Sequence, residues 1–103
     1  MKVNNPQAKD VSLSELRDFL REDKTELHEY KYGEYVCTHY ATALHNNAEE
    51  HGIRACIVQN GDMSHSFNAF ETTDRGLVFV DLSREKDEVF QYSEIPLDFH
   101  YYW

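Results

Sequence analysis

Three residues whose side chains can supply a nucleophile, a base and an orienting acid occur in the order Cys37, His65 and Asp81. A thiol is a good nucleophile only once it ionises, and its ordinary pKa is about 8.5. A helix N-terminus favours the thiolate because it carries roughly half a positive charge. A histidine beside the sulfur can accept its proton, and an aspartate on the other ring nitrogen fixes the tautomer. These residue types indicate nucleophilic thiol chemistry.

The segment 37–51 is predicted to be a helix that carries Cys37 at its N-terminus. Its apolar positions recur at the spacing of one helical face and are Cys37, Tyr40, Ala41, Leu44 and Ala48. The histidines of the segment fall away from this face, so we expect them on the surface: His39, His45 and His51. Gly52 is typical of the residue that ends a helix.

Two strands are predicted to position His65 and Asp81. The segment 65–72 opens with His65, and the apolar segment 77–83 contains Asp81 near its end. His65 and Asp81 share a sheet face only if the hairpin pairs odd-numbered residues with odd-numbered ones. A two-residue loop would pair odd with even, whereas a three-residue loop with Gly76 in the left-handed conformation, or a bulge, restores the match.

The remaining segments predict an α+β domain. A helix near 13–22 should begin at a capping box formed by Ser12 and Glu15, and a strand is expected over 53–59. A charged loop and one or two aromatic strands should follow residue 83. Two helices followed by consecutive strands predict N-terminal helices packed on one face of an antiparallel sheet, in a single domain over 1–103.

The core of this domain should lie between the second helix and the sheet. We expect Leu44, together with Ala41 and Ala48, to be buried against the strand 77–82. Val78 or Phe79 should be among the contacts. Cys56 lies in the middle of a predicted strand, which indicates a buried structural residue and not a second nucleophile.

Residues 35–83, quoted as "YVCTHYATALHNNAEEHGIRACIVQ…SHSFNAFETTDRGLVFVDLS", resemble the core of a transglutaminase-like domain of the papain-like thiol-enzyme superfamily. The shared pattern is a cysteine opening a helix, a glycine ending it before "IRA", a histidine opening the next strand and an aspartate closing the strand after. The resemblance implies a papain-like α+β fold with Cys37 as nucleophile, His65 as general base and acid, and Asp81 as orienter.

The activity implied by the resemblance is thiol-dependent acyl transfer or amide hydrolysis on a protein or peptide, without a cofactor. Tyr35 is the candidate that would join the Cys37 backbone N–H in an oxyanion hole, with Tyr30 and Tyr32 as alternatives. The family also contains inactive members, so a non-catalytic binding module is the alternative function.

A metal site is a third interpretation, built on Cys37 and His39 with Cys56 or His65. Zinc sites usually show closely spaced ligand pairs twice over. Here one such pair occurs, and residues two apart on a helix diverge, so no metal is predicted.

The composition of the chain indicates which classes of partner are unfavourable. The 103 residues include 19 acidic and 10 basic side chains, giving a net charge of −9. Phosphate backbones and anionic membranes would be repelled, so no nucleic acid and no membrane is expected as partner. No apolar run approaches the roughly 18–20 residues of a membrane span, and no signal peptide opens the chain. A cytoplasmic setting follows by default, and the interior-like ending "FHYYW" leaves open additional domains of a longer chain.

Overall fold

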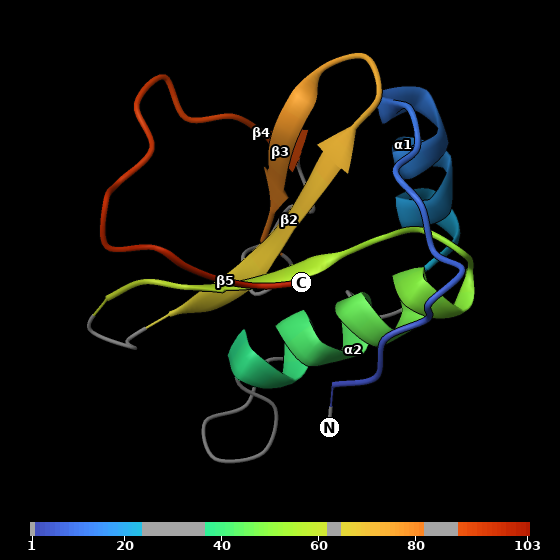
Figure 1. The fold of residues 1–103 in the computed structure, drawn as a ribbon, viewed down its shortest axis with the longest axis horizontal. Helices are drawn as coiled ribbons and strands as arrows, with labels where there is room; N and C mark the ends of the chain where they lie inside the picture. Colours follow the sequence, from blue (N-terminus) through green and yellow to red (C-terminus); the bar gives the residue numbers. More distant parts are fainter. Residues whose placement is uncertain (1, 24–36, 62–64, 82–88) are drawn as a thin grey trace.

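The computed structural model describes residues 2–23, 37–61, 65–81 and 89–103, and for Cys37 it describes the backbone alone. Within these residues two helices pack on one face of a five-stranded antiparallel sheet (Figure 1). The predicted α+β class is therefore confirmed. The strands follow the order β4-β3-β2-β1-β5, and the elements are α1 (Leu13–Glu22), α2 (Cys37–Glu50), β1 (Cys56–Gln59), β2 (Ser66–Thr72), β3 (Gly76–Val80), β4 (Val89–Phe90) and β5 (His100–Tyr102).

Helix α1 begins and ends where the sequence predicts. The Ser12 hydroxyl accepts the Glu15 backbone N–H at 3.2 Å, and the Glu15 carboxylate accepts the Ser12 N–H at 3.4 Å. These two bonds satisfy N–H groups that the first helical turn would otherwise leave unpaired. The helix buries Leu16, Phe19 and Leu20 toward the sheet. Neither helix in the described ranges is long and apolar enough to cross a bilayer.

A glycine in the left-handed conformation lies just beyond the end of helix α2 and terminates it, as predicted. Gly52 has φ 82°. Its N–H donates to the Glu49 carbonyl at 3.0 Å, and the Ile53 N–H donates to the Ala48 carbonyl at 2.9 Å. This Schellman pattern satisfies two carbonyls of the last turn. The predicted apolar positions Tyr40, Ala41, Leu44 and Ala48 are all buried.

The prediction that His45 lies on the surface is wrong. His45 is fully buried, whereas His39 and His51 are exposed as expected. His45 lies four residues after Ala41 and three before Ala48, which is the spacing of the buried face of the helix.

A polar segment of the chain also lies against α2. Residues 2–5, called here the N-terminal strap, run along this helix (Figure 1), and the Val3 N–H donates to the Asn46 side-chain oxygen at 2.8 Å. The polar composition of the strap gave no sign of this contact.

The β2–β3 hairpin has the register that places odd residues opposite odd residues. Ala69 pairs with Phe79, and Thr72 pairs with Gly76 across a three-residue loop. Gly76 has φ 71°, the left-handed conformation expected there. The Thr72 hydroxyl donates to the Gly76 carbonyl at 2.7 Å and accepts the Arg75 N–H at 3.0 Å, which fixes the loop.

Two buried clusters lie on opposite faces of the sheet. The helix-side cluster joins α1 and α2 to the sheet and includes Leu16, Leu44, Ala48, Phe70, Val78 and Val80. The other cluster consists of Cys56, Val58, Phe67, Ala69 and Phe79, with Phe90, Phe99, Tyr101 and Trp103 packed against it. Val78 therefore shares a cluster with Leu44, as expected, together with Val80 of the same strand, and Phe79 belongs to the cluster on the opposite face.

Strand β1 is shorter than the predicted 53–59. Ile53 instead forms a parallel bridge with Lys9, and the Arg54 N–H donates to the Lys9 carbonyl at 3.0 Å. Lys9 therefore binds backbone groups on either side of Ile53 that would have paired with β2 if β1 were longer.

Candidate functional site

The centre of the candidate site is a hydrogen-bonded pair. His65 Nε2 lies 2.6 Å from Asp81 Oδ2, which is the contact that the sequence predicts. Asp81 directly follows β3 and is buried, and the His65 side chain retains an exposed fraction of 29%. An ionised carboxylate can only accept, so Nε2 donates in this bond and the pair fixes the Nε2–H tautomer.

The hairpin register brings the pair together. His65 precedes β2 and Asp81 follows β3, so both lie at the same end of the hairpin. The odd-to-odd pairing puts them on one side of the sheet. A loop one residue shorter would have turned the two side chains to opposite faces.

The start of α2 lies against the start of β2. The hydroxyl oxygens of Thr38 and Ser66 are 3.5 Å apart. One turn further along, the Asn68 side-chain amide donates to the Ala41 carbonyl at 2.9 Å and to the Cys56 carbonyl at 3.2 Å. Because Asn68 is almost fully buried, these bonds hold α2 firmly on β2 and β1. The first turn of α2 carries no acidic residue.

Side-chain alternation in β2 places the His65 ring toward the aromatic face of the sheet. Ser66 and Asn68 contact α2, whereas Phe67 belongs to the cluster on the opposite face. The His65 ring stacks on Phe67, with ring centroids 5.6 Å apart and an interplanar angle of 26°. The pair with Asp81 therefore sits where the end of the hairpin meets the aromatic cluster.

The Cys37 side chain lies outside the described residues, as do the oxyanion candidate Tyr35 and its alternatives Tyr30 and Tyr32. Neither a family model, nor a curated protein, nor a solved structure matches the chain. The backbone of Cys37 lies at the first residue of α2, next to Thr38, whose hydroxyl lies close to Ser66.

Cys56 has the character of a buried structural thiol. Its exposed fraction is 0%. Burial raises the pKa of Cys56 to about 12, because the thiolate would lose its hydration inside the sheet. A thiol with this pKa stays protonated at neutral pH and is a poor nucleophile.

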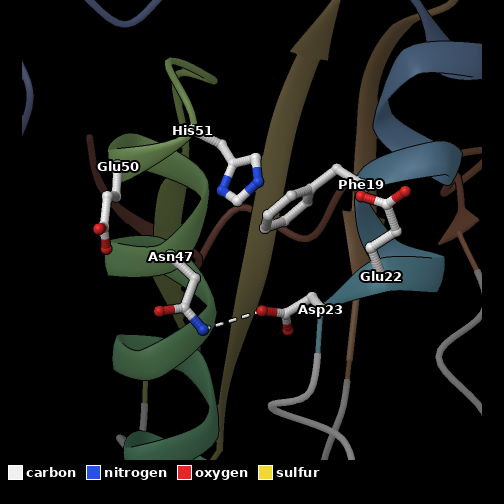
Figure 2. Close-up of a pocket in the computed structure, with 6 residues that line it drawn as sticks. All are labelled: Phe19, Glu22, Asp23, Asn47, Glu50 and His51. Atoms are coloured by element: carbon white, nitrogen blue, oxygen red, sulfur yellow. Dashed lines mark hydrogen bonds between the residues drawn. The ribbon is translucent and has the colours of Figure 1, made fainter.

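A separate pocket lies between the C-terminal ends of α1 and α2 (Figure 2). Its volume is about 370 Å³, and the lining residues are Phe19, Glu22, Asp23, Asn47, Glu50 and His51. The Asn47 amide donates to the Asp23 carboxylate at 2.8 Å, and the rings of Phe19 and His51 lie 5.0 Å apart. Across the described residues, no group of three or more His, Cys, Asp or Glu side chains is placed to hold a metal ion.

Sequence reasoning missed two features near the candidate site. His45 shares the burial of the apolar stripe, and a signal was present, because positions 41, 45 and 48 follow the i, i+4 and i+7 spacing of one face. Asn68 ties α2 to two strands. There was little signal for this role in the sequence, because Asn68 is one of four polar residues in the seven-residue strand β2.

Proposed function

We propose that the chain is a papain-like, transglutaminase-like domain that performs thiol-dependent acyl transfer or amide hydrolysis on a protein or peptide. Cys37 is the nucleophile, His65 the general base and acid, and Asp81 the orienting residue. The observation that carries this proposal is the 2.6 Å bond between His65 and Asp81 at the end of β2 that contacts the start of α2.

The first step in this proposal is activation of the thiol. Asp81 holds the proton of His65 on Nε2, so Nδ1 is the nitrogen that receives the Cys37 proton. The N-terminus of the 14-residue helix α2 favours the resulting thiolate. The absence of an acidic residue in that first turn leaves this effect unopposed within the helix.

Acyl transfer then follows in two balanced steps. The thiolate attacks the amide carbonyl carbon, and the carbon–nitrogen bond breaks as His65 returns its proton to the leaving amine. The thioester that results is attacked by water or by an amine, whose proton passes to His65, and the thiolate departs. The backbone N–H of Cys37 and the Tyr35 hydroxyl would bind the oxyanion of each tetrahedral intermediate. We favour water as acceptor, because water needs no second binding site.

A non-catalytic binding module is the second candidate, and one observation favours it. The His65 ring stacks on Phe67, on the sheet face opposite α2. In this alternative the bond to Asp81 braces the end of the hairpin, and the imidazole does not exchange protons with Cys37. Its partner would bind without any chemical change.

The decisive experiment offers the protein an activated acyl donor, the p-nitrophenyl ester of an N-acetylated amino acid. The catalytic proposal expects a burst of p-nitrophenol close to one equivalent and an acyl adduct on Cys37 in the peptide map. Cys37→Ser and His65→Ala should abolish the burst, whereas Cys56→Ser is the matched cysteine control that keeps it. Added primary amine should divert the acyl product if transfer occurs. An undiminished burst and acyl adduct in His65→Ala would support the binding module, and so would the absence of any burst in the native chain.

A further inference from the structure

The buried imidazole of His45 has a defined tautomer. Its Nδ1 lies 2.9 Å from the Asn46 side-chain oxygen, and the Val3 N–H donates to the same oxygen at 2.8 Å. A carbonyl oxygen can only accept, so Nδ1 must be the donor in this contact. The neutral ring therefore carries its proton on Nδ1, and its Nε2 bears a lone pair.

The second ring nitrogen, Nε2, differs from the other buried side-chain nitrogen and oxygen atoms of the described residues. His45 Nε2 is buried and has no hydrogen-bond partner among those residues. Buried polar atoms are rarely left unsatisfied. A proton added at Nε2 would create an N–H without an acceptor and a positive charge away from water, and both changes disfavour the closed structure.

The charges around the ring do not offset this penalty. Burial lowers the pKa of His45, whereas the bond to Asn46 and the carboxylate of Glu49, on the next turn of α2, act to raise it. Lys2 of the N-terminal strap adds its own repulsion. Burial is the largest effect, so the net direction is downward.

The N-terminal strap is held on α2 by polar contacts. Besides the Val3 bond, the Asn5 N–H and side-chain amide donate to the Glu49 carboxylate and carbonyl at 2.8 and 2.9 Å. Lys2 and Asn4 donate to the Trp103 carbonyl. Val3 is the apolar residue of the strap, and it is 59% exposed. A segment without a buried apolar anchor opens at lower cost than the core beneath it.

We propose that His45 and the N-terminal strap form an acid-sensitive latch, in which protonation of Nε2 releases residues 2–5 from α2 while the helix and the sheet stay folded. Because the pKa of His45 in the closed form lies below its ordinary value of about 6.5, the latch keeps its full stability above about pH 6.5. It loses that stability as the pH falls from there toward the closed-form pKa.

Amide hydrogen exchange measured by NMR at pH 7.5, 6.5 and 5.5 tests the latch. The protection factors of Val3 and Asn5 should fall by up to about tenfold for each pH unit below about 6.5, the limit for one proton. Those of Ile57 and Val58 in β1 should stay constant. His45→Asn keeps a donor for Asn46 and does not titrate, so it should abolish the pH dependence. His51→Asn, at an exposed histidine of the same segment, should leave it unchanged.

A second pair of variants keeps the test valid even if His45→Asn does not fold. Val3→Pro removes the N–H that binds Asn46, whereas Val3→Ala keeps it. The His45 ring should titrate closer to 6.5 in Val3→Pro and as in the native chain in Val3→Ala. The latch is refuted by strap amides that keep their protection at pH 5.5, by joint loss of strap and β1 protection, or by an unchanged His45 titration in Val3→Pro.

Discussion

The hydroxyl oxygens of Thr38 and Ser66 lie 3.5 Å apart, and these two residues directly follow Cys37 and His65 in the chain. The contact joins the first turn of α2 to the first residue of β2. Cys37 and His65, 28 residues apart in sequence, thus lie at adjoining ends of α2 and β2. The predictions below test whether the chain uses this junction for chemistry.

The first prediction concerns the two thiols. If Cys37 is the nucleophile, as proposed, it should be alkylated by iodoacetamide well before Cys56 and should keep reacting near pH 6, because the helix N-terminus and His65 would both favour its thiolate. Cys56, whose pKa burial raises to about 12, should stay inert in the folded chain. Mass spectrometry of each cysteine across pH 5–9 measures both profiles, and His65→Ala should move the Cys37 profile to higher pH. A Cys37 profile centred at the free-thiol value of about 8.5 would contradict activation.

The second prediction concerns the proton on His65. Nitrogen chemical shifts should show the Nε2–H tautomer in the neutral ring, because the Asp81 carboxylate accepts from Nε2 at 2.6 Å. Asp81→Ala should remove this preference. His100, exposed on β5, is an internal control whose tautomer should not respond to that change. A neutral ring that carries its proton on Nδ1 in the native chain would argue against the proposed orientation.

The third prediction concerns the helix-side core. Leu44→Ala should lower the free energy of unfolding by about 2–5 kcal/mol, since Leu44 is fully buried and its loss leaves a cavity. Leu97→Ala makes the same chemical change at a fully exposed position and should cost less than about 0.5 kcal/mol. Chemical denaturation of both variants measures the difference. Equal losses would mean that α2 does not pack as described.

The fourth prediction concerns the Asn68 amide. Asn68→Ala removes the donor for the Ala41 and Cys56 carbonyls and should cost about 1–3 kcal/mol. If Cys37 is the nucleophile, the same change should slow acylation by about tenfold or more, because the start of α2 loses its fixed position on β2. Asn47→Ala is the matched control, since it breaks a bond to Asp23 at the far end of α2 and should not slow acylation. If Asn68→Ala leaves the acylation rate unchanged, the position of α2 on β2 does not control the reaction at Cys37.

Local chemistry explains which parts of the fold were predictable. The Ser12–Glu15 capping box and the left-handed glycines 52 and 76 act over three or four residues, and all were read correctly from the sequence. The sequence left the hairpin register dependent on the loop length, and the structure shows the three-residue loop that pairs odd residues with odd ones. The contact of His65 with Asp81 was predictable on the same condition, because it depends on one hairpin.

Contacts between distant segments were not predictable in this way. The N-terminal strap is one example, because its bonds to α2 span more than 40 residues of chain. The shortened β1 likewise depends on Lys9, which competes for its backbone groups. Polar segments that pack through backbone and amide bonds leave no hydrophobic period, so the patterns that reveal helices and strands do not reveal them.

The described sheet ends on both sides in very short strands. β4 has two residues and β5 has three, whereas the central β2 has seven. An edge strand can template the pairing of another chain, and the number of rungs it offers grows with its length. β4 and β5 are the edge strands of this sheet, and each offers only a few backbone groups to the strand of another chain. The described sheet therefore presents little backbone for cross-β growth.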